Sequence, residues 1–381
     1  MVVGASLAGS TLVDTLRRRG FGGDITLVGA EPHVAYNRPA LSKGVLAGTD
    51  SLADITLPPL SCEVDERIGT AAVALDQDRR EIVLAGGDRI RYDRLAITTG
   101  ARARRLADLG AADPGVVETT FRDLDDALAL DRLLAARPHV LVVGAGILGM
   151  ELASACLDRG STVTLVDRQP PLRTQLGPYL AELLRSAAER RGALIADDPG
   201  GVRLRATADG TPAAELSDGR RFEGDLVLSA VGCLPEVEWL RSSGMSVDGG
   251  IAIDTRCRVS PTVVAAGDVA AFPTVQGPRR TPLWNAAIEQ ARTAAAALLD
   301  GDAAAPLVPD PLFWTEQFGL KVRISGPTPA VGDPTFVEGR SRADGGLLLG
   351  WPGEPGTAAA VNRRIPITRL RALTRPDNLI T

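Results

Sequence analysis

Two glycine-rich segments, at residues 4–9 and 144–149, constrain this chain more than any other feature of its sequence. The first reads Gly-Ala-Ser-Leu-Ala-Gly and the second reads Gly-Ala-Gly-Ile-Leu-Gly. In such a segment, small residues allow a tight turn from a strand into a helix and let the backbone approach a pyrophosphate at the helix N-terminus. We therefore predict two dinucleotide-binding turns, with the contacts made by Gly4, Ser6, Ala8 and Gly9 in the first and by Gly144, Gly146 and Gly149 in the second.

Each turn is followed by a strand-like segment that leads to an acidic residue. Residues 25–28 lead to Glu31 and residues 163–166 lead to Asp167, which lie 22 and 18 positions after the last glycine of their turns. Both spacings are close to the roughly 20 residues at which the acid of this motif reaches a ribose. A single segment of this kind is a weak signal, and Ser6 replaces the middle glycine of the first one. Two complete units in one chain nevertheless indicate two dinucleotide sites.

Composition restricts the class of protein. The 381 residues are 45% hydrophobic and 23% charged, which is typical of a soluble globular enzyme with two or three domains. The formal net charge is −5, from 42 basic and 47 acidic residues, and no block of like charge predicts a nucleic-acid or membrane partner. The chain enters the first turn at once, without an apolar run of membrane-spanning length, so we expect a cytoplasmic protein. Only three residues precede Gly4, whereas a strand usually has about five. A start codon further upstream is therefore an open alternative, and a chain that lacks those residues would bind FAD poorly.

The cysteines exclude one route for electrons. Cys62, Cys156, Cys233 and Cys257 are separated by 94, 77 and 24 residues, so the sequence contains neither a close-spaced redox pair nor a set of metal ligands. We expect buried or incidental thiols. Electrons that leave a bound flavin would then have no internal dithiol and no iron–sulfur cluster of the chain's own to pass through.

The order of segments predicts an α/β fold with an inserted domain. A strand–helix–strand unit covers residues 1–45, hairpin-like alternation follows through 67–76 and 80–92, and a second unit begins with the strand at 140–143 after a helix at 124–134. The small-residue strand end at 263–268 resembles the one at 95–100, so we expect the chain to return to its first domain. The predicted architecture is two Rossmann-like domains, at 1–112 with 235–305 and at 113–234, followed by a small α+β C-terminal domain at 306–381.

This order resembles the pyridine-nucleotide-dependent FAD reductases, and more narrowly the ferredoxin reductases that serve cytochromes P450 and aromatic-ring oxygenases. The resemblance runs from end to end of the chain. It rests on the first turn and on the segments Tyr36-Asn37-Arg38-Pro39-Ala40-Leu41-Ser42-Lys43, Thr99-Gly100, Glu151 after the second turn, Ala266-Gly267-Asp268, Trp284 and Phe313-Trp314-Thr315-Glu316-Gln317-Phe318. The segment that ends at Lys43 and the tryptophan pair separate this branch from the disulfide-reducing relatives, which carry a cysteine pair in the first domain.

The resemblance implies that Lys43 lies beside the flavin and pairs with Glu151 as the catalytic pair. Taken out of context, Lys43 would be a solvated surface lysine and Glu151 an acid favoured by the dipole of its helix. Hydride transfer from nicotinamide to flavin requires stacked rings in a dry site and charged groups that tune the flavin. The resemblance implies that the paired lysine stays charged and rigid while the glutamate turns when nicotinamide binds, which would meet that need.

The resemblance assigns further residues to cofactor binding. Asp268 would accept a hydrogen bond from a ribityl hydroxyl, and a helix that starts near Trp284 would direct its N-terminus at the flavin pyrimidine edge. Other predicted cofactor contacts are Arg38, Gly100, Arg104, Gly232 and Trp314. Pro282 and Asn37 depart from the family pattern, in which a glutamate and an aspartate are common. We therefore expect fewer polar contacts on the Pro282 side and one charge fewer near Arg38. Trp314 would equally suit a core position.

Asp167 predicts the nucleotide. A carboxylate at this point binds both hydroxyls of the adenine ribose and repels a 2′-phosphate, which favours NADH over NADPH, although the neighbouring Arg168 could soften the preference. We therefore expect FAD and NADH as cofactors.

The predicted function is transfer of electrons from NADH through FAD to a small, acidic iron–sulfur ferredoxin that feeds an oxygenase. Two alternatives stay open: direct reduction of a small acceptor such as oxygen or a quinone, and a flavin-bound redox sensor with little turnover. The arginine pairs Arg279-Arg280 and Arg363-Arg364 are candidates for ferredoxin docking and equally suit ordinary solvated positions.

Overall fold

The computed structural model describes residues 1–245, 249–339 and 345–375, and the chain divides into two compact units. Unit 1 is made of Met1–Asn37, Ala53–Arg102 and Leu234–Asp310. Unit 2 is made of Arg38–Leu52, Ala103–Cys233 and the described part of Pro311–Thr381. Residues 246–248, 340–344 and 376–381, which fall within the predicted domains, lie outside the described part. The three-domain division itself stays a prediction.

A six-stranded sheet forms the centre of unit 1. Its strands are β1 (Val2–Val3), β2 (Thr26–Gly29), β3 (Asp65–Ile68), β7 (Leu95–Ile97), β18 (Arg258–Ser260) and β19 (Val263–Ala265), in the order β18-β19-β7-β1-β2-β3. All pairs are parallel except that of β18 with β19. The apolar residues of β1, β7 and β19 are buried, as expected for a parallel sheet that is covered on both faces.

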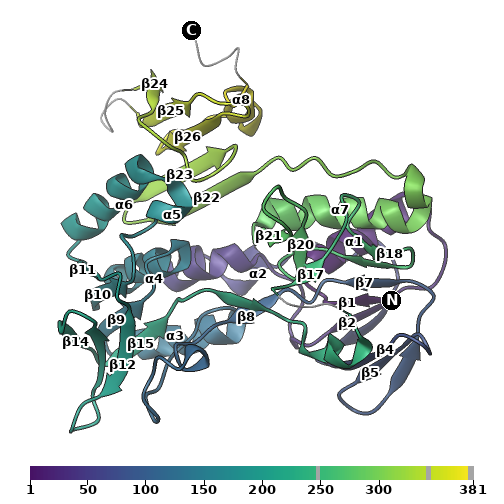
Figure 1. Ribbon diagram of the computed structural model, residues 1–381, viewed down its shortest axis with the longest axis horizontal. Coiled ribbons are helices and arrows are strands. Elements are labelled where there is room, and N and C mark those ends of the chain that lie inside the picture. The colour runs from purple at the N-terminus through teal and green to yellow at the C-terminus, as the bar shows by residue number, and fades with distance from the viewer. Residues whose placement is uncertain (246–248, 340–344, 376–381) are drawn as a thin grey trace. The chain divides into compact units, whose positions relative to one another are not determined.

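Helices α1 (Leu7–Arg18) and α7 (Trp284–Asp300) pack side by side in unit 1, and α7 also contacts β19 (Figure 1). Helix α1 connects β1 to β2, so the predicted opening strand–helix–strand unit is confirmed. The pairing of β19 with β7 shows that the segment after residue 234 contributes to the same sheet. A 3-10 helix, η5 (Gly301–Ala303), follows α7.

Smaller antiparallel strands complete unit 1. They are β4 (Ala72–Asp76), β5 (Glu81–Leu84) and β6 (Arg89–Arg91) in one sheet and β17 (Ile251–Ala252), β20 (Ala270–Phe272) and β21 (Arg279–Arg280) in another, with β17 parallel to β20. The 3-10 helix η4 (Glu238–Ser243) packs against β4. The prediction of a hairpin-like segment at 67–76 is wrong for its first residues and confirmed for the rest. Its first part belongs to β3, which pairs parallel with β2, and only β4 joins the antiparallel sheet.

The second parallel sheet lies in unit 2. Its strands are β9 (His139–Val143), β10 (Thr162–Asp167), β11 (Leu194–Asp197) and β15 (Leu226–Ser229), in the order β11-β10-β9-β15. Helix α4 (Ile147–Asp158) connects β9 to β10 and contacts both. The predicted helix at 124–134 is α3 (Leu124–Leu134), which begins with a capping box formed by Asp123 and Asp126. This part of the sequence-based prediction is confirmed.

The remaining elements of this stretch are an antiparallel sheet and two helices. The sheet contains β12 (Val202–Ala206), β13 (Pro212–Leu216) and β14 (Arg221–Glu223), and the helices are α5 (Arg173–Leu176) and α6 (Pro178–Arg190). The short strands β8 (Ala101–Ala103) and β16 (Cys233–Pro235) pair with each other at the points where the chain leaves and re-enters unit 1.

A five-stranded antiparallel sheet ends the chain in unit 2. Its strands are β22 (Leu312–Gln317), β23 (Leu320–Ser325), β24 (Thr335–Glu338), β25 (Leu347–Trp351) and β26 (Thr357–Val361), in the order β22-β23-β26-β25-β24. Helix α8 (Ile367–Ala372) packs on β23 and β26 (Figure 1). Every residue of β25 and β26 is buried. Across the described ranges, no helix combines the length and apolar character needed to cross a bilayer.

Candidate functional site

The first glycine turn fits a close approach between a strand and a helix. Gly4 has a φ of +114°, and a Cβ at this position would lie 2.1 Å from the Thr98 carbonyl oxygen. A Cβ at Gly9 would lie 1.9 Å from the Gly4 carbonyl oxygen. The Thr98 hydroxyl donates to that same oxygen at 2.8 Å, which fixes the turn to β7. Only glycine fits at either position, so the turn is dictated by the fold of unit 1.

The second turn repeats this geometry in unit 2. Gly144 has a φ of +102°, and a Cβ at Gly149 would lie 1.8 Å from the Gly144 carbonyl oxygen. Gly146 differs, because an added Cβ would meet only the Gln175 side-chain nitrogen, at 3.7 Å. The fold therefore does not require glycine at Gly146. Its missing side chain leaves the backbone open on the side where a pyrophosphate would approach.

The helix N-termini above both turns suit a phosphate. Helix α1 is preceded by Ser6 and helix α4 by Gly146, and neither N-terminus has a side-chain cap or an acidic residue in its first turn. The first amides of each helix thus point outward with the positive end of the helix dipole. The two predicted turns have the shape, the open amides and the polarity that FAD and NADH pyrophosphates require.

Glu31 lies just after the end of β2 and Asp167 lies at the end of β10, as predicted, and each accepts a hydrogen bond from a nearby residue. The Tyr36 hydroxyl donates to Glu31 Oε2 at 2.6 Å in unit 1. In unit 2, Asp167 Oδ2 accepts from the Ala145 amide at 2.5 Å, and Oδ1 accepts from the Arg168 amide at 2.5 Å. Asp167 therefore has a structural task that the sequence did not indicate. It ties the end of β10 to the glycine turn.

Unit 1 gathers several of the other predicted flavin contacts around its glycine turn. A Cβ at Gly267 would lie 3.2 Å from the Ala8 side chain and 3.8 Å from the Ala287 side chain, so the loop that carries Asp268 lies against α1 and α7. Helix α7 begins at Trp284, as predicted. Gly100, with a φ of +73°, joins β7 to β8.

Other residues predicted to bind cofactors belong to unit 2. Arg38 donates to the Arg122 carbonyl oxygen at 2.9 Å. The Arg104 amide donates to the Gly232 carbonyl oxygen at 3.0 Å, which brings these two predicted residues together. Trp314 is half-buried on β22. Their contacts with a flavin stay predictions.

Lys43 and Glu151 form a buried ion pair in unit 2. The distance from Lys43 Nζ to Glu151 Oε2 is 2.8 Å, and the two side chains are 13% and 4% exposed. The Lys43 ammonium also donates to the Pro39 carbonyl oxygen at 3.0 Å. Lys43 is therefore not a solvated surface lysine, and Glu151 is held by more than the dipole of α4.

Local backbone geometry places the lysine. Lys43 lies within the π-helix η2 (Leu41–Val45), which follows the 3-10 helix η1 (Arg38–Ala40). Its φ of −115° and ψ of −105° are not helical. Single π-turns of this kind occur often at functional sites. The segment contacts both α3 and α4, which fixes the direction of the side chain.

Two more residues complete this centre, and the sequence did not indicate a role for either. The Ser42 hydroxyl donates to Glu151 Oε2 and the Thr315 hydroxyl to Oε1, each at 2.6 Å. Short hydroxyl side chains so far apart in the chain carry no recognisable spacing. One signal for Lys43 was available, because Lys43 and Lys321 are the only lysines in a chain that otherwise uses arginine. Arginine cannot replace the compact ammonium of lysine in a small buried pair.

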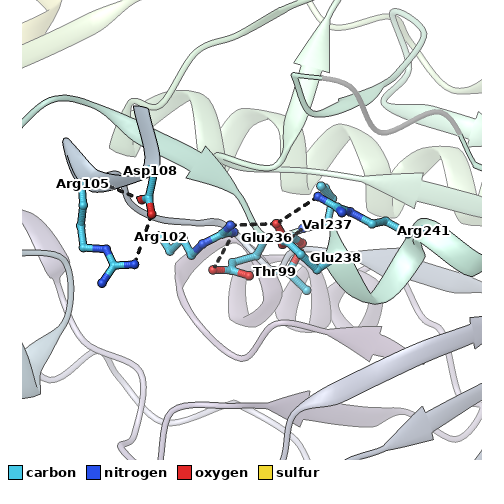
Figure 2. A network of polar contacts seen from close by, with 8 residues as sticks. All are labelled: Thr99, Arg102, Arg105, Asp108, Glu236, Val237, Glu238 and Arg241. Carbon is cyan, nitrogen blue, oxygen red and sulfur yellow. Dashed lines mark hydrogen bonds and ion pairs between the residues drawn. The ribbon is translucent and has the colours of Figure 1, made fainter. Parts of the chain in front are cut away.

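A separate polar network in unit 1 joins the segment after β7 to the segment after β16 (Figure 2). Arg102 reaches Glu238 at 2.8 Å and Glu236 at 3.5 Å, and the Thr99 hydroxyl donates to the Glu236 carbonyl oxygen at 2.7 Å. This network links the strand end that leaves the sheet to the segment that returns. Figure 2 also draws the pair of Arg105 and Asp108 in unit 2, 3.2 Å apart.

The four cysteines are all free. Burial raises the pKa of Cys156 to about 12, and burial with the nearby Asp254 charge raises that of Cys257 to about 12. A thiol with so high a pKa is almost never a thiolate at neutral pH, which makes it a poor redox nucleophile. In the described residues, no group of three potential ligands is placed to hold a metal ion.

The chain is similar to known proteins along most of its length. The chain is 31% identical over 381 residues to the 3-phenylpropionate/cinnamic acid dioxygenase ferredoxin–NAD(+) reductase component of Photorhabdus laumondii, covering 98% of this chain and 95% of that protein. It is 35% identical over 355 residues to the biphenyl dioxygenase system ferredoxin–NAD(+) reductase component of Paraburkholderia xenovorans, with coverages of 91% and 85%.

Solved structures agree with this similarity. The ferredoxin reductase for the CYP199A2 system from Rhodopseudomonas palustris matches with a TM-score of 0.83 and 29% identity, over 95% of this chain and 90% of that one. The reductase in the covalent putidaredoxin reductase–putidaredoxin complex matches with a TM-score of 0.82 and 26% identity, over 98% and 92%. Residues 1–291 match the pyridine nucleotide-disulphide oxidoreductase family, and the chain belongs to that family.

Proposed function

We propose that this protein is an FAD-dependent ferredoxin–NAD(+) reductase, which passes electrons from NADH to a small iron–sulfur ferredoxin that serves an oxygenase. The observation that carries the proposal is the end-to-end similarity to ferredoxin–NAD(+) reductase components of dioxygenase systems. The buried pair of Lys43 and Glu151 supports it, because the structure brings together the two residues that the family resemblance assigns to the flavin site.

The parts of the chain have distinct tasks in this proposal. Residues 1–112 and 235–305 would bind FAD, with the first turn holding the pyrophosphate, Glu31 the ribose and Asp268 the ribityl chain. Residues 113–234 would bind NADH through the second turn and Asp167. Residues 306–381 would bring Trp314 to the flavin side and contribute to docking of the ferredoxin. Arg38, Gly100, Arg104, Gly232 and Trp284 would complete the cofactor contacts.

Bound FAD would supply the ability to accept a hydride and to release electrons one at a time. Lys43 would present a fixed positive charge next to the reacting rings. Before nicotinamide binds, Glu151 would pair with that charge, and it would turn when nicotinamide binds while Lys43 stays in place. The first turn of α7 would direct its partial positive charge at the pyrimidine edge.

The free cysteines distinguish this proposal from disulfide reduction. Cys156 and Cys257 are buried with raised pKa values, so an internal dithiol that receives electrons is not supported. Four free thiols also suit a reducing compartment, which supports a cytoplasmic location as part of the proposal.

The experiment is steady-state oxidation of NADH by the purified yellow protein with and without an added ferredoxin. We expect slow oxidation alone and a large increase when ferredoxin and a terminal electron acceptor are present. Fast oxidation with oxygen or a quinone and no response to ferredoxin would favour the small-acceptor alternative. A flavin that NADH does not reduce would favour the sensor.

A further inference from the structure

The end of strand β22 presents two polar side chains to helix α4. Residues of a strand alternate between its two faces, so Thr315 and Gln317 share one face while Trp314 lies on the other. Thr315 and Gln317 are 0% and 3% exposed. The Thr315 hydroxyl reaches Glu151, and the Phe318 amide donates to the Ser154 hydroxyl at 2.7 Å. The strand and the residue that follows it are therefore joined to α4 at two points, about one helical turn apart.

The hydrogen bonds of Thr315 have a fixed direction. Glu151, paired with the Lys43 ammonium, is a carboxylate and can only accept. The single hydroxyl proton of Thr315 must therefore point at Glu151 Oε1, which leaves its oxygen to accept from the Gln317 amide nitrogen at 2.9 Å. Gln317 thus orients the hydroxyl, and the hydroxyl orients the carboxylate.

The two oxygens of Glu151 have separate partners. Oε2 receives Lys43 at 2.8 Å and Ser42 at 2.6 Å, whereas Thr315 is the donor to Oε1. Without the Thr315 hydroxyl, Oε1 would be left buried without this donor, which costs about 1–3 kcal/mol for an ordinary group and more for a charged one. The carboxylate would then rotate to find another donor, and its geometry toward Lys43 would change.

We propose that Thr315, oriented by Gln317, is a positioning residue that holds Glu151 in the rotamer that pairs with Lys43. The inference rests on the proposed function, because it gives the C-terminal sheet a direct influence on the pair assigned to hydride transfer. Thr315 itself acts only through Glu151.

The test compares three variants of the purified protein. Thr315→Val removes the hydroxyl at nearly constant volume, and Thr315→Ser keeps the hydroxyl. Ser154→Ala is the matched control, because it breaks the other link between β22 and α4 without touching Glu151. Thermal unfolding establishes that each variant is folded.

The first measurement is the rate at which an amine-acetylating reagent modifies each lysine, followed by peptide mass spectrometry. The chain has only Lys43 and Lys321, and the Lys321 side chain is 72% exposed, so it serves as an internal standard. We expect Thr315→Val to increase the rate at Lys43 by about tenfold, as one lost hydrogen bond to a charged group predicts, while Lys321 is unchanged. Thr315→Ser and Ser154→Ala should stay within about twofold of wild type, since neither removes that hydrogen bond.

The second measurement is flavin reduction by NADH under anaerobic stopped flow. Thr315→Val should lower the limiting rate by about tenfold, because Glu151 would no longer hold the Lys43 ammonium in its place. In the background of Glu151→Leu, which removes both acceptor oxygens, the further change to Val at 315 should have little effect on either readout, which shows that Thr315 acts through Glu151.

Specific results would overturn the inference. Unchanged Lys43 labelling in Thr315→Val, or an equal increase in Ser154→Ala, would mean that Thr315 does not hold the pair. If Thr315→Val does not fold, Gln317→Leu takes its place, with an expected increase of about threefold at Lys43, and an unchanged rate would overturn the inference. A wild-type protein that NADH does not reduce would refute the proposed function instead, since the labelling readout does not depend on turnover.

Discussion

At the scale of single residues, Asp167 combines two demands on one carboxylate. Its oxygens accept from the amides of Ala145 and Arg168, so it stabilises the glycine turn, and it is also the residue that we propose binds the ribose. Replacement by alanine would remove both roles at once. Replacement by asparagine removes the charge and keeps an oxygen that can accept from one amide, so it is the cleaner probe of nucleotide choice.

We therefore expect Asp167→Asn to raise the ratio of kcat/KM for NADPH to kcat/KM for NADH by about tenfold. That factor corresponds to losing about 1.4 kcal/mol of repulsion between the carboxylate and a 2′-phosphate at a partly exposed site. Asp197→Asn is the matched control, because Asp197 ends the neighbouring strand β11 in register with Asp167. A wild-type protein that already prefers NADPH would remove Asp167 from this role.

At the scale of elements, the second glycine turn contains one glycine that the fold requires, Gly149, and one that only the proposed ligand requires, Gly146. A Cβ at Gly149 would collide with the Gly144 carbonyl oxygen, whereas a Cβ at Gly146 has room. We expect Gly149→Ala to lower the free energy of unfolding by roughly 3 kcal/mol or more, because backbone would have to move. Gly146→Ala should cost at most about 1 kcal/mol.

The same pair of variants reports on binding. Gly146→Ala should keep its FAD and its fold but bind NADH more weakly, since the new methyl group stands where the pyrophosphate would approach. Urea unfolding measures the stability of each variant, and titration with NADH or a non-reducing analogue measures its affinity for the nucleotide. Unchanged NADH affinity in folded Gly146→Ala would contradict the placement of the nucleotide at this turn.

The sequence could predict elements whose pattern is local. Both glycine turns, the helix at 124–134 and the strand at 140–143 follow from spacing and periodicity, and the structure confirms them. The segment 67–76 was harder, because an edge strand of a parallel sheet and one arm of a hairpin carry the same alternation. The contacts of Glu151 with Ser42 and Thr315 were out of reach, since they join residues separated by 109 and 164 positions.

At the scale of the whole molecule, a net charge of −5 must be reconciled with the acidic ferredoxin that we propose as the partner. The four candidate docking arginines differ in their contacts and exposure. Arg280 donates to the Asp268 carbonyl oxygen and Arg363 forms an ion pair with Glu338, so both have structural tasks. Arg279 and Arg364 are exposed and are the members of each pair that suit docking.

We expect Arg279→Glu or Arg364→Glu to lower kcat/KM for ferredoxin several-fold at low salt, while flavin reduction by NADH stays unchanged. The wild-type rate with ferredoxin should fall as salt shortens the Debye length to about 10 Å at 0.1 M. Arg203→Glu, at an exposed position on β12, is the control for net charge alone. An equal loss in all three variants would mean that overall charge, rather than a local patch, sets the rate.

The most direct test of the account is an anaerobic count of electrons. The protein, a limiting amount of NADH and an excess of oxidised ferredoxin are mixed, and the reduced ferredoxin is measured from its visible absorbance. A hydride carries two electrons and a small iron–sulfur ferredoxin accepts one, so the account predicts two ferredoxins reduced for each NADH consumed. NADH consumption that leaves the ferredoxin oxidised would contradict it.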